Sequence, residues 1–165
     1  MTRLTMMTGA LGVALLMSTG AFAQVPPPAP DYGPTVTLEQ AQKAVNAALA
    51  EAKKTPYPMA ITIVGPSGNL VYFLRMDGTQ YASLAISQHK ARVAATYKRP
   101  TKALEDRVAA GGIGITVLTL DGVIASAGGI PLMSNSKIIG AIGVSGGPTG
   151  VIDSGPAQAG ADALK

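Results

Sequence analysis

The chain has 165 residues, with 13 basic and 9 acidic side chains, one histidine and a formal net charge of +4. This mild charge, with two Phe, five Tyr and no Trp, lacks the dense basic face and stacking aromatics of nucleic-acid-binding proteins, so we expect no nucleic-acid partner. The absence of cysteine excludes disulfides and a lipoprotein thiol. Charged residues are only 13% of the chain, which predicts that another subunit covers part of the surface.

Residues 1–23 are predicted to be a signal peptide. Arg3 provides a positive start, Leu11 to Met17 form an uncharged apolar stretch, and Ala21-Phe22-Ala23 fits an A-x-A cleavage site. The apolar stretch is too short to span a bilayer comfortably, so we expect no stable membrane span. We therefore predict export to the periplasm or the extracellular space, and a retained N-terminal anchor is the alternative. Removing the leader removes Arg3 and no acid, which leaves 12 basic and 9 acidic residues and a charge of +3.

The mature chain is predicted to start with a proline-rich linker over residues 24–36, because closely spaced prolines favour an extended tether. Residues 37–165 are expected to form one domain, long enough to bury a core.

The first half of this domain has clear signals for helices and strands. The Thr37-x-x-Gln40 capping box starts a helix that Pro56 ends. Two β-rich runs, at 59–64 and 70–76, flank a turn and predict a hairpin. Two further helices are expected over 81–97 and 101–108, with Thr101 as the cap of the second.

In the second half, alternating apolar residues at 115–120 and 123–127 surround Asp121-Gly122, and this pattern predicts another hairpin. A strand over 137–145 and a helix over 153–164 follow. Tight turns between strands favour an antiparallel sheet with helices packed on it, which is an α+β fold.

Gly143-x-Ser145-x-Gly147 fits the nucleophile elbow of α/β-hydrolases. In those enzymes a histidine base follows the serine, whereas the single histidine here, His89, precedes Ser145. The glycines are better explained by a buried strand that another backbone approaches closely.

Several segments, in order, resemble the GlcG/HbpS-like haem-binding family, and the resemblance extends from Thr37 to Leu164. The segments that carry it are Arg75-Met76-Asp77-Gly78, Ser83, Lys90-Ala91-x-x-Ala94, Arg99-Pro100-Thr101 with Leu104, Gly128-Gly129-Ile130-Pro131, Ile139 to Gly146, and Asp153-x-x-x-Ala157-x-Ala159-Gly160.

The resemblance implies a profilin-like fold, with a five-stranded antiparallel sheet and helices packed on both faces. It also implies a homo-oligomer, octameric in the best-known exported member. Exported relatives bind haem, and some are credited with haem degradation or iron sequestration. Cytoplasmic relatives accompany glycolate oxidation or form the C-terminal part of a cobalamin adenosyltransferase.

Haem is therefore the expected cofactor, and several residues are candidates to hold it. His89 is the candidate axial ligand of the haem iron, with a surface histidine as the alternative. Arg75, Lys90 and Arg99 are candidate partners of the propionates, although a solvated helix face explains such cations equally well. Thr101 is a further candidate, because the family includes a haem contact through a threonine oxygen.

The glycine loop that includes Gly146 and Gly147 is a candidate anion site, since its backbone N–H groups could face a ligand. No cluster of His, Asp and Glu has the spacing of a metal site.

Three functions remain open at this point. The first is an exported haem-binding protein. The second is an enzyme or accessory protein acting on a small organic acid in glycolate-type catabolism, with Asp77 or Asp153 as the base. The third is a non-catalytic oligomeric interaction module.

Overall fold

Four antiparallel strands and four α-helices make up most of the computed structural model, which describes residues 27–165. The signal peptide expected over 1–23 lies outside the described residues. The elements in chain order are α1 (Leu38–Ala52), β1 (Ala60–Val64), β2 (Leu70–Arg75), α2 (Tyr81–Thr96), α3 (Thr101–Ala109), the 3₁₀ helix η1 (Gly112–Thr119), β3 (Gly129–Ser134), β4 (Lys137–Ser145) and α4 (Gly150–Asp162).

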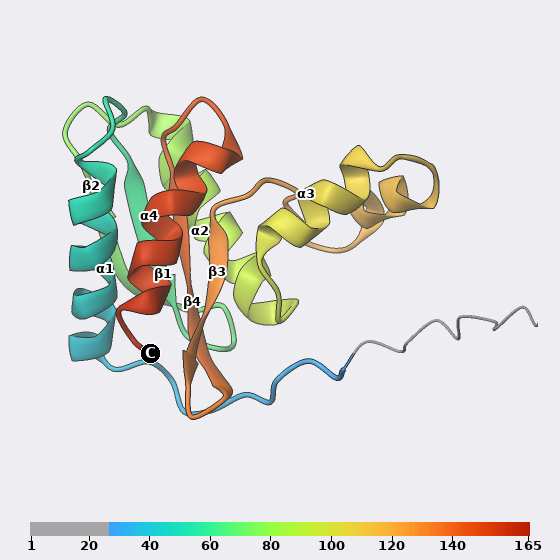
Figure 1. The fold of residues 1–165 in the computed structure, drawn as a ribbon, viewed down its shortest axis with the longest axis horizontal. Coiled ribbons are helices and arrows are strands. Elements are labelled where there is room, and N and C mark those ends of the chain that lie inside the picture. Colours follow the sequence, from blue (N-terminus) through green and yellow to red (C-terminus); the bar gives the residue numbers. More distant parts are fainter. Residues whose placement is uncertain (1–26) are drawn as a thin grey trace, which may run out of the picture.

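The sheet has the strand order β2-β1-β4-β3, so β2 and β3 are its two edges. Helix α2 covers one face, and α1 and α4 lie together on the other (Figure 1). Strand residues alternate between these two layers as expected. Ile61 and Ile142 join the core beneath α1 and α4, whereas Val64 and Ala141 pack on the alanines of α2.

The predicted α+β fold with an antiparallel sheet is confirmed, but the expected count of five strands is wrong. The sheet has four strands in the described residues: the two strands predicted over 115–127 do not form, and β3 supplies the fourth strand beside β1, β2 and β4. Most of the first half of this segment belongs to η1, whose N-cap Gly111 and first residue Gly112 both have a positive φ. Carbonyl oxygens in η1 accept bonds from the hydroxyls of Thr116 and Thr119, which satisfies the backbone locally without a partner strand.

Helix α1 begins as the sequence predicts. The Thr37 hydroxyl accepts a bond from the Gln40 backbone N–H at 3.2 Å, and the Gln40 side chain accepts one from the Thr37 N–H at 2.9 Å. The last helix begins at Gly150, three residues before the predicted start, and contains Pro156.

The close packing of α2 on the sheet depends on Gly143 of β4. A Cβ at this position would lie 2.1 Å from the Ser87 carbonyl oxygen. The glycine run of β4 therefore permits backbone approach, as the sequence predicts.

Part of the predicted linker over 24–36 is bound to the domain. The Gly33 N–H donates to the Ile138 oxygen at 2.8 Å, and the Val36 N–H donates to the Ile139 oxygen at 2.7 Å. The Tyr32 hydroxyl donates to the Ala95 oxygen at 3.1 Å. Residues 31–36 thus form a strap along β4 rather than a free tether. Between residues 27 and 165, every helix falls short of the length and hydropathy that crossing a bilayer requires.

Candidate functional site

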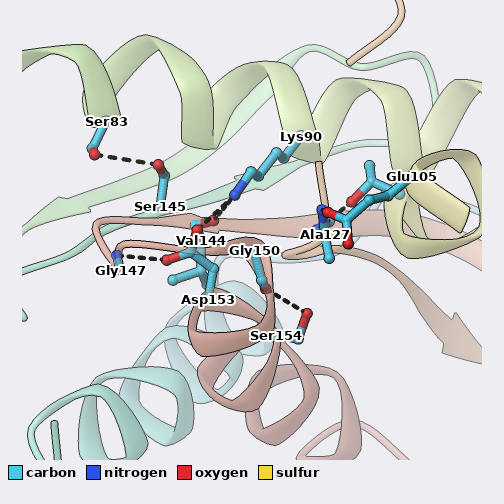
Figure 2. A network of polar contacts seen from close by, with 12 residues as sticks. Ser83, Lys90, Glu105, Ala127, Val144, Ser145, Gly147, Gly150, Asp153 and Ser154 are labelled. Carbon is cyan, nitrogen blue, oxygen red and sulfur yellow. Dashed lines mark hydrogen bonds and ion pairs between the residues drawn. The ribbon is translucent and has the colours of Figure 1, made fainter. Parts of the chain in front are cut away.

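A buried ion pair joins α2 to α4. The Lys90 Nζ lies 2.7 Å from the Asp153 Oδ2, and the two side chains are 2% and 4% exposed. Lys90 also donates to the Val144 oxygen at 3.2 Å. Figure 2 shows Lys90 reaching from α2 past Val144 to Asp153. The ion pair connects helices that lie on opposite faces of the sheet.

The second oxygen of Asp153 binds the loop that follows β4. Its Oδ1 accepts a bond from the Gly147 N–H at 2.8 Å (Figure 2). The Gly147 N–H of the predicted anion loop is therefore already paired within the protein. Gly146 has a φ of +156°, and a Cβ there would lie 2.3 Å from the Pro58 oxygen, so this residue is packed against backbone. With both carboxylate oxygens occupied, Asp153 is poorly placed to act as a general base.

Two glycines at the start of β3 cover the ion pair. Gly128 has a φ of +115°, and a Cβ there would lie 3.1 Å from the Lys90 Nζ and 2.8 Å from the Asp153 Cβ. The next residue, Gly129, donates its N–H to the Thr101 hydroxyl at 2.9 Å. Thr101 is fully buried and is the first residue of α3, whose N-cap is Pro100. The predicted capping role of Thr101 is therefore wrong, because its oxygen holds the edge strand instead.

Above these glycines, a groove follows the free edge of β3. Two adjoining cavities of about 350 and 380 Å³ share Pro100, Ile130 and Gln158 as lining residues. We call this surface the edge groove. Its remaining lining residues are Pro30, Lys98, Lys102, Gly128, Gly129, Pro131, Met133, Ile138, Val151, Ser154, Gly155, Ala161 and Lys165. The groove is mainly apolar, and lysines supply its cationic groups.

The lysines of the edge groove are held only by exposed partners. Lys102 pairs with Asp106, and this hydrogen bond raises the pKa of Lys102. Lys165 pairs with Asp162 at 2.6 Å. The hydrogen bond from Lys165 lowers the pKa of the Asp162 carboxyl, and a hydrogen bond from Gln158 lowers it further. Because exposed pairs contribute little to stability, these lysines can exchange their partners for a ligand carboxylate. The Lys98 Nζ lies 4.3 Å from the centre of the Tyr32 ring.

The other predicted site residues lie away from this groove. The half-buried His89 donates its Nε2–H to the Gly122 oxygen at 2.7 Å, so an iron bond at Nε2 would have to replace that contact. Arg75 ends β2, at the opposite edge of the sheet from β3, and stacks on Tyr81 at 5.3 Å. Arg99 is exposed and donates to the Tyr97 oxygen.

The structure thus brings Lys90 and Thr101 together beneath the edge groove and leaves His89, Arg75 and Arg99 outside it. Sequence reasoning missed Gln158 and Lys165, since neither belongs to a local motif. Ser145, at the apparent nucleophile elbow, is buried and donates its hydroxyl to Ser83 at 3.2 Å. Within residues 27–165, His, Asp and Glu side chains form no group of three that could hold a metal ion.

The fold and this groove define the class of protein, an α+β protein with an apolar, lysine-bearing groove at one sheet edge. The chain belongs to the HbpS-like family, because the family profile described as "Haem degrading protein HbpS-like" matches residues 36–162. The resemblance predicted from the sequence motifs is therefore confirmed.

Individual relatives agree with this assignment. Protein GlcG of Escherichia coli K12 is 35% identical over 110 residues, which cover 67% of this chain and 81% of GlcG. The crystal structure of a double mutant of HbpS from Streptomyces reticuli is 31% identical with a TM-score of 0.73, and the match covers 96% of this chain and 99% of that one. The crystal structure of a PduOC:heme complex is 25% identical with a TM-score of 0.70, covering 79% and 96% of the two chains.

Proposed function

We propose that this protein binds haem, and that the edge groove receives it. The observation that carries the proposal is an apolar groove with lysines around it, in a chain of the HbpS-like family. A solved relative forms a complex with haem, which adds support.

The residues of the groove suit the chemistry of a porphyrin. Ile130, Pro131 and Met133 offer apolar contact to a flat ring along the edge of β3. Lys98 and Lys165 carry the charge that two propionates require. When bound, haem would supply its iron for ligand binding or redox chemistry, and the protein would set its orientation and its exposure to water.

Lys90 and Thr101 then have a positioning role. Both lie directly under Gly128 and Gly129, which line the groove. The ion pair and the Thr101 bond fix the backbone on which the ligand would rest.

A hemin titration of the mature chain tests this proposal. We expect a Soret band that saturates at one haem per chain, together with a higher melting temperature, because a ligand that binds only the folded state stabilises it. A spectrum identical to that of free hemin, with no change in melting temperature, would refute haem binding.

Three finer parts of the proposal concern the fate of the haem, the assembly and the location of the protein. We propose that the function is haem capture with iron sequestration or haem degradation, performed by an exported homo-oligomer. Release of biliverdin-like pigment or iron from the complex in the presence of a reductant and dioxygen would separate degradation from storage. The N-terminal residue of protein recovered from the periplasm or medium would test export, with Gln24 as the expected first residue.

A further inference from the structure

One part of the fold projects from the rest of the domain. Helix α3, η1 and the following turn, residues 101–127, form an arm that extends away from the sheet (Figure 1). Its inner side has a small core of Val93, Leu104 and Val117. Two hydrogen bonds hold the turn at the base of the arm. Tyr97, at the C-terminal end of α2, donates its hydroxyl to the Asp121 oxygen at 2.6 Å, and His89 of α2 donates to the Gly122 oxygen at 2.7 Å. The arm is therefore firmly anchored.

The arm exposes four large apolar side chains within eight residues of the chain. Ile113 is 81% exposed, and three more side chains, Ile115, Leu118 and Leu120, are 53%, 55% and 44% exposed. We call these four residues the arm patch. Other strongly exposed aliphatic residues among 27–165, such as Leu38, Leu70 and Val151, come from separate elements. The arm patch therefore gathers exposed apolar side chains in one segment of the chain.

The composition of the segment limits what can cover the patch. Residues 108–120 contain no charged side chain. A basic or acidic peptide would find no complementary charge there, and the segment has neither the lysines nor the aromatic anchors of a membrane-surface helix. An equally uncharged apolar surface is the best match.

We propose that the arm patch is a contact between two copies of this chain, each patch packing on the same patch of the other copy. The inference rests on the proposed homo-oligomer and identifies the surface that makes it. Two-fold contacts of this kind are the commonest in homo-oligomers, and projecting arms can meet without collision of the two domains.

The size of the patch indicates the strength of this contact. Each patch exposes roughly 400 Å² of apolar surface, the size of the largest patch on a typical monomer, which is often functional. Two patches together bury about 800 Å², less than the roughly 1,200 Å² or more of a stable interface. The arm contact alone is thus a weak one, and we expect it to show concentration-dependent association in the micromolar range.

The absence of cysteine permits a direct test. Ile113→Cys, Ile115→Cys and Leu118→Cys are made singly and exposed to a mild oxidant. At a two-fold contact, a cysteine that lies within about 7 Å of its own copy across the axis gives a disulfide-linked dimer, and the three positions are spread along the patch. The matched control is Val151→Cys on α4, which is 64% exposed and lies outside the arm. If none of the three exceeds this control in dimer yield and substitution of the patch also leaves the assembly unchanged, the like-to-like contact is refuted.

A second test measures assembly by sedimentation velocity over a range of concentrations. The double variant Ile113→Ser/Leu118→Ser should shift the wild-type distribution toward smaller species. Leu38→Ser/Leu70→Ser removes comparably exposed side chains elsewhere, 58% and 57% exposed in the wild type, and should leave it unchanged. Circular dichroism checks that both variants fold.

The possible outcomes separate the contact from the other proposals. A wild-type oligomer that persists in the arm variant refutes the arm contact but keeps the oligomer. A wild type that is monomeric at every concentration refutes both the arm contact and the homo-oligomer. A monomer that co-sediments with phosphatidylcholine vesicles, and loses this binding in the arm variant, also refutes both. Hemin binding should be unchanged in the same variants, because the arm patch lies outside the edge groove. Hemin binding therefore tests the edge groove independently of the arm contact.

Discussion

Lys90 and Asp153 are 63 residues apart in the sequence and 2.7 Å apart in the structure, where they form a buried ion pair across the end of the sheet. The pair links the helix layers on opposite faces, and it lies directly under the glycines that line the edge groove. The contact between the helix layers and the backbone beneath the candidate site therefore share one ion pair.

Lys90→Met should destabilise the domain strongly. Removing one partner of a buried ion pair leaves the other charge without compensation, at a cost of about 3 kcal/mol. Urea unfolding measures this loss, and Lys54→Met is the matched control because its pair with Glu51 is exposed. Adding Asp153→Asn to Lys90→Met should recover about 1 kcal/mol or more, since the isolated buried charge is then gone. Equal losses in the two single lysine variants would contradict this interpretation.

Gly143→Ala should disturb the contact between β4 and α2. The new Cβ would lie 2.1 Å from the Ser87 oxygen, so the helix must move and the domain should lose about 2 kcal/mol or more. Gly155→Ala is the control, because its Cβ would meet nothing within 4 Å in the middle of α4. We expect that variant to gain about 0.5 kcal/mol from helix propensity. Thermal unfolding of both proteins measures the difference, and a neutral Gly143→Ala would be the unexpected result.

His89→Gln distinguishes an iron ligand from a structural contact. Glutamine keeps an N–H donor that can reach the Gly122 oxygen but is not a haem ligand of the usual kind. Because His89 lies outside the edge groove, we expect unchanged hemin affinity and an unchanged Soret maximum. His89→Ala removes the hydrogen bond as well and should cost about 1 kcal/mol of stability. A shifted Soret band in His89→Gln would instead support the axial-ligand prediction.

The sequence predicted those parts of the fold that depend on neighbours along the chain. The capping box at Thr37 and the Pro56 stop placed α1, and β-rich runs on either side of a turn placed β1 and β2. The prediction of a hairpin around Asp121-Gly122 is wrong, because contacts with a distant part of the chain hold this segment. Its turn is held by His89 of α2 and by Tyr97 at the end of that helix, and this contact could not be read from the local alternation.

The candidate site was harder to predict. The sequence predicts Lys90 and Thr101 as haem contacts, but their partners, Asp153 and Gly129, lie 63 and 28 residues away in the chain. The edge groove combines residues from the loop after α2, from β3 and from α4. No single segment carries its pattern, so only the fold shows that these residues share a surface.

Hemin affinity of a groove variant tests the central claim most directly. Lys98→Asn/Lys165→Gln removes two cations of the edge groove, and asparagine tolerates the positive φ of 54° at position 98. Lys43→Gln/Lys54→Gln removes the same charge elsewhere. If each propionate contact contributes about 1 kcal/mol, the groove variant should bind hemin about 30-fold more weakly, whereas the control should match the wild type. Equal hemin affinities in the wild type and both variants would contradict the account and place the ligand outside the edge groove.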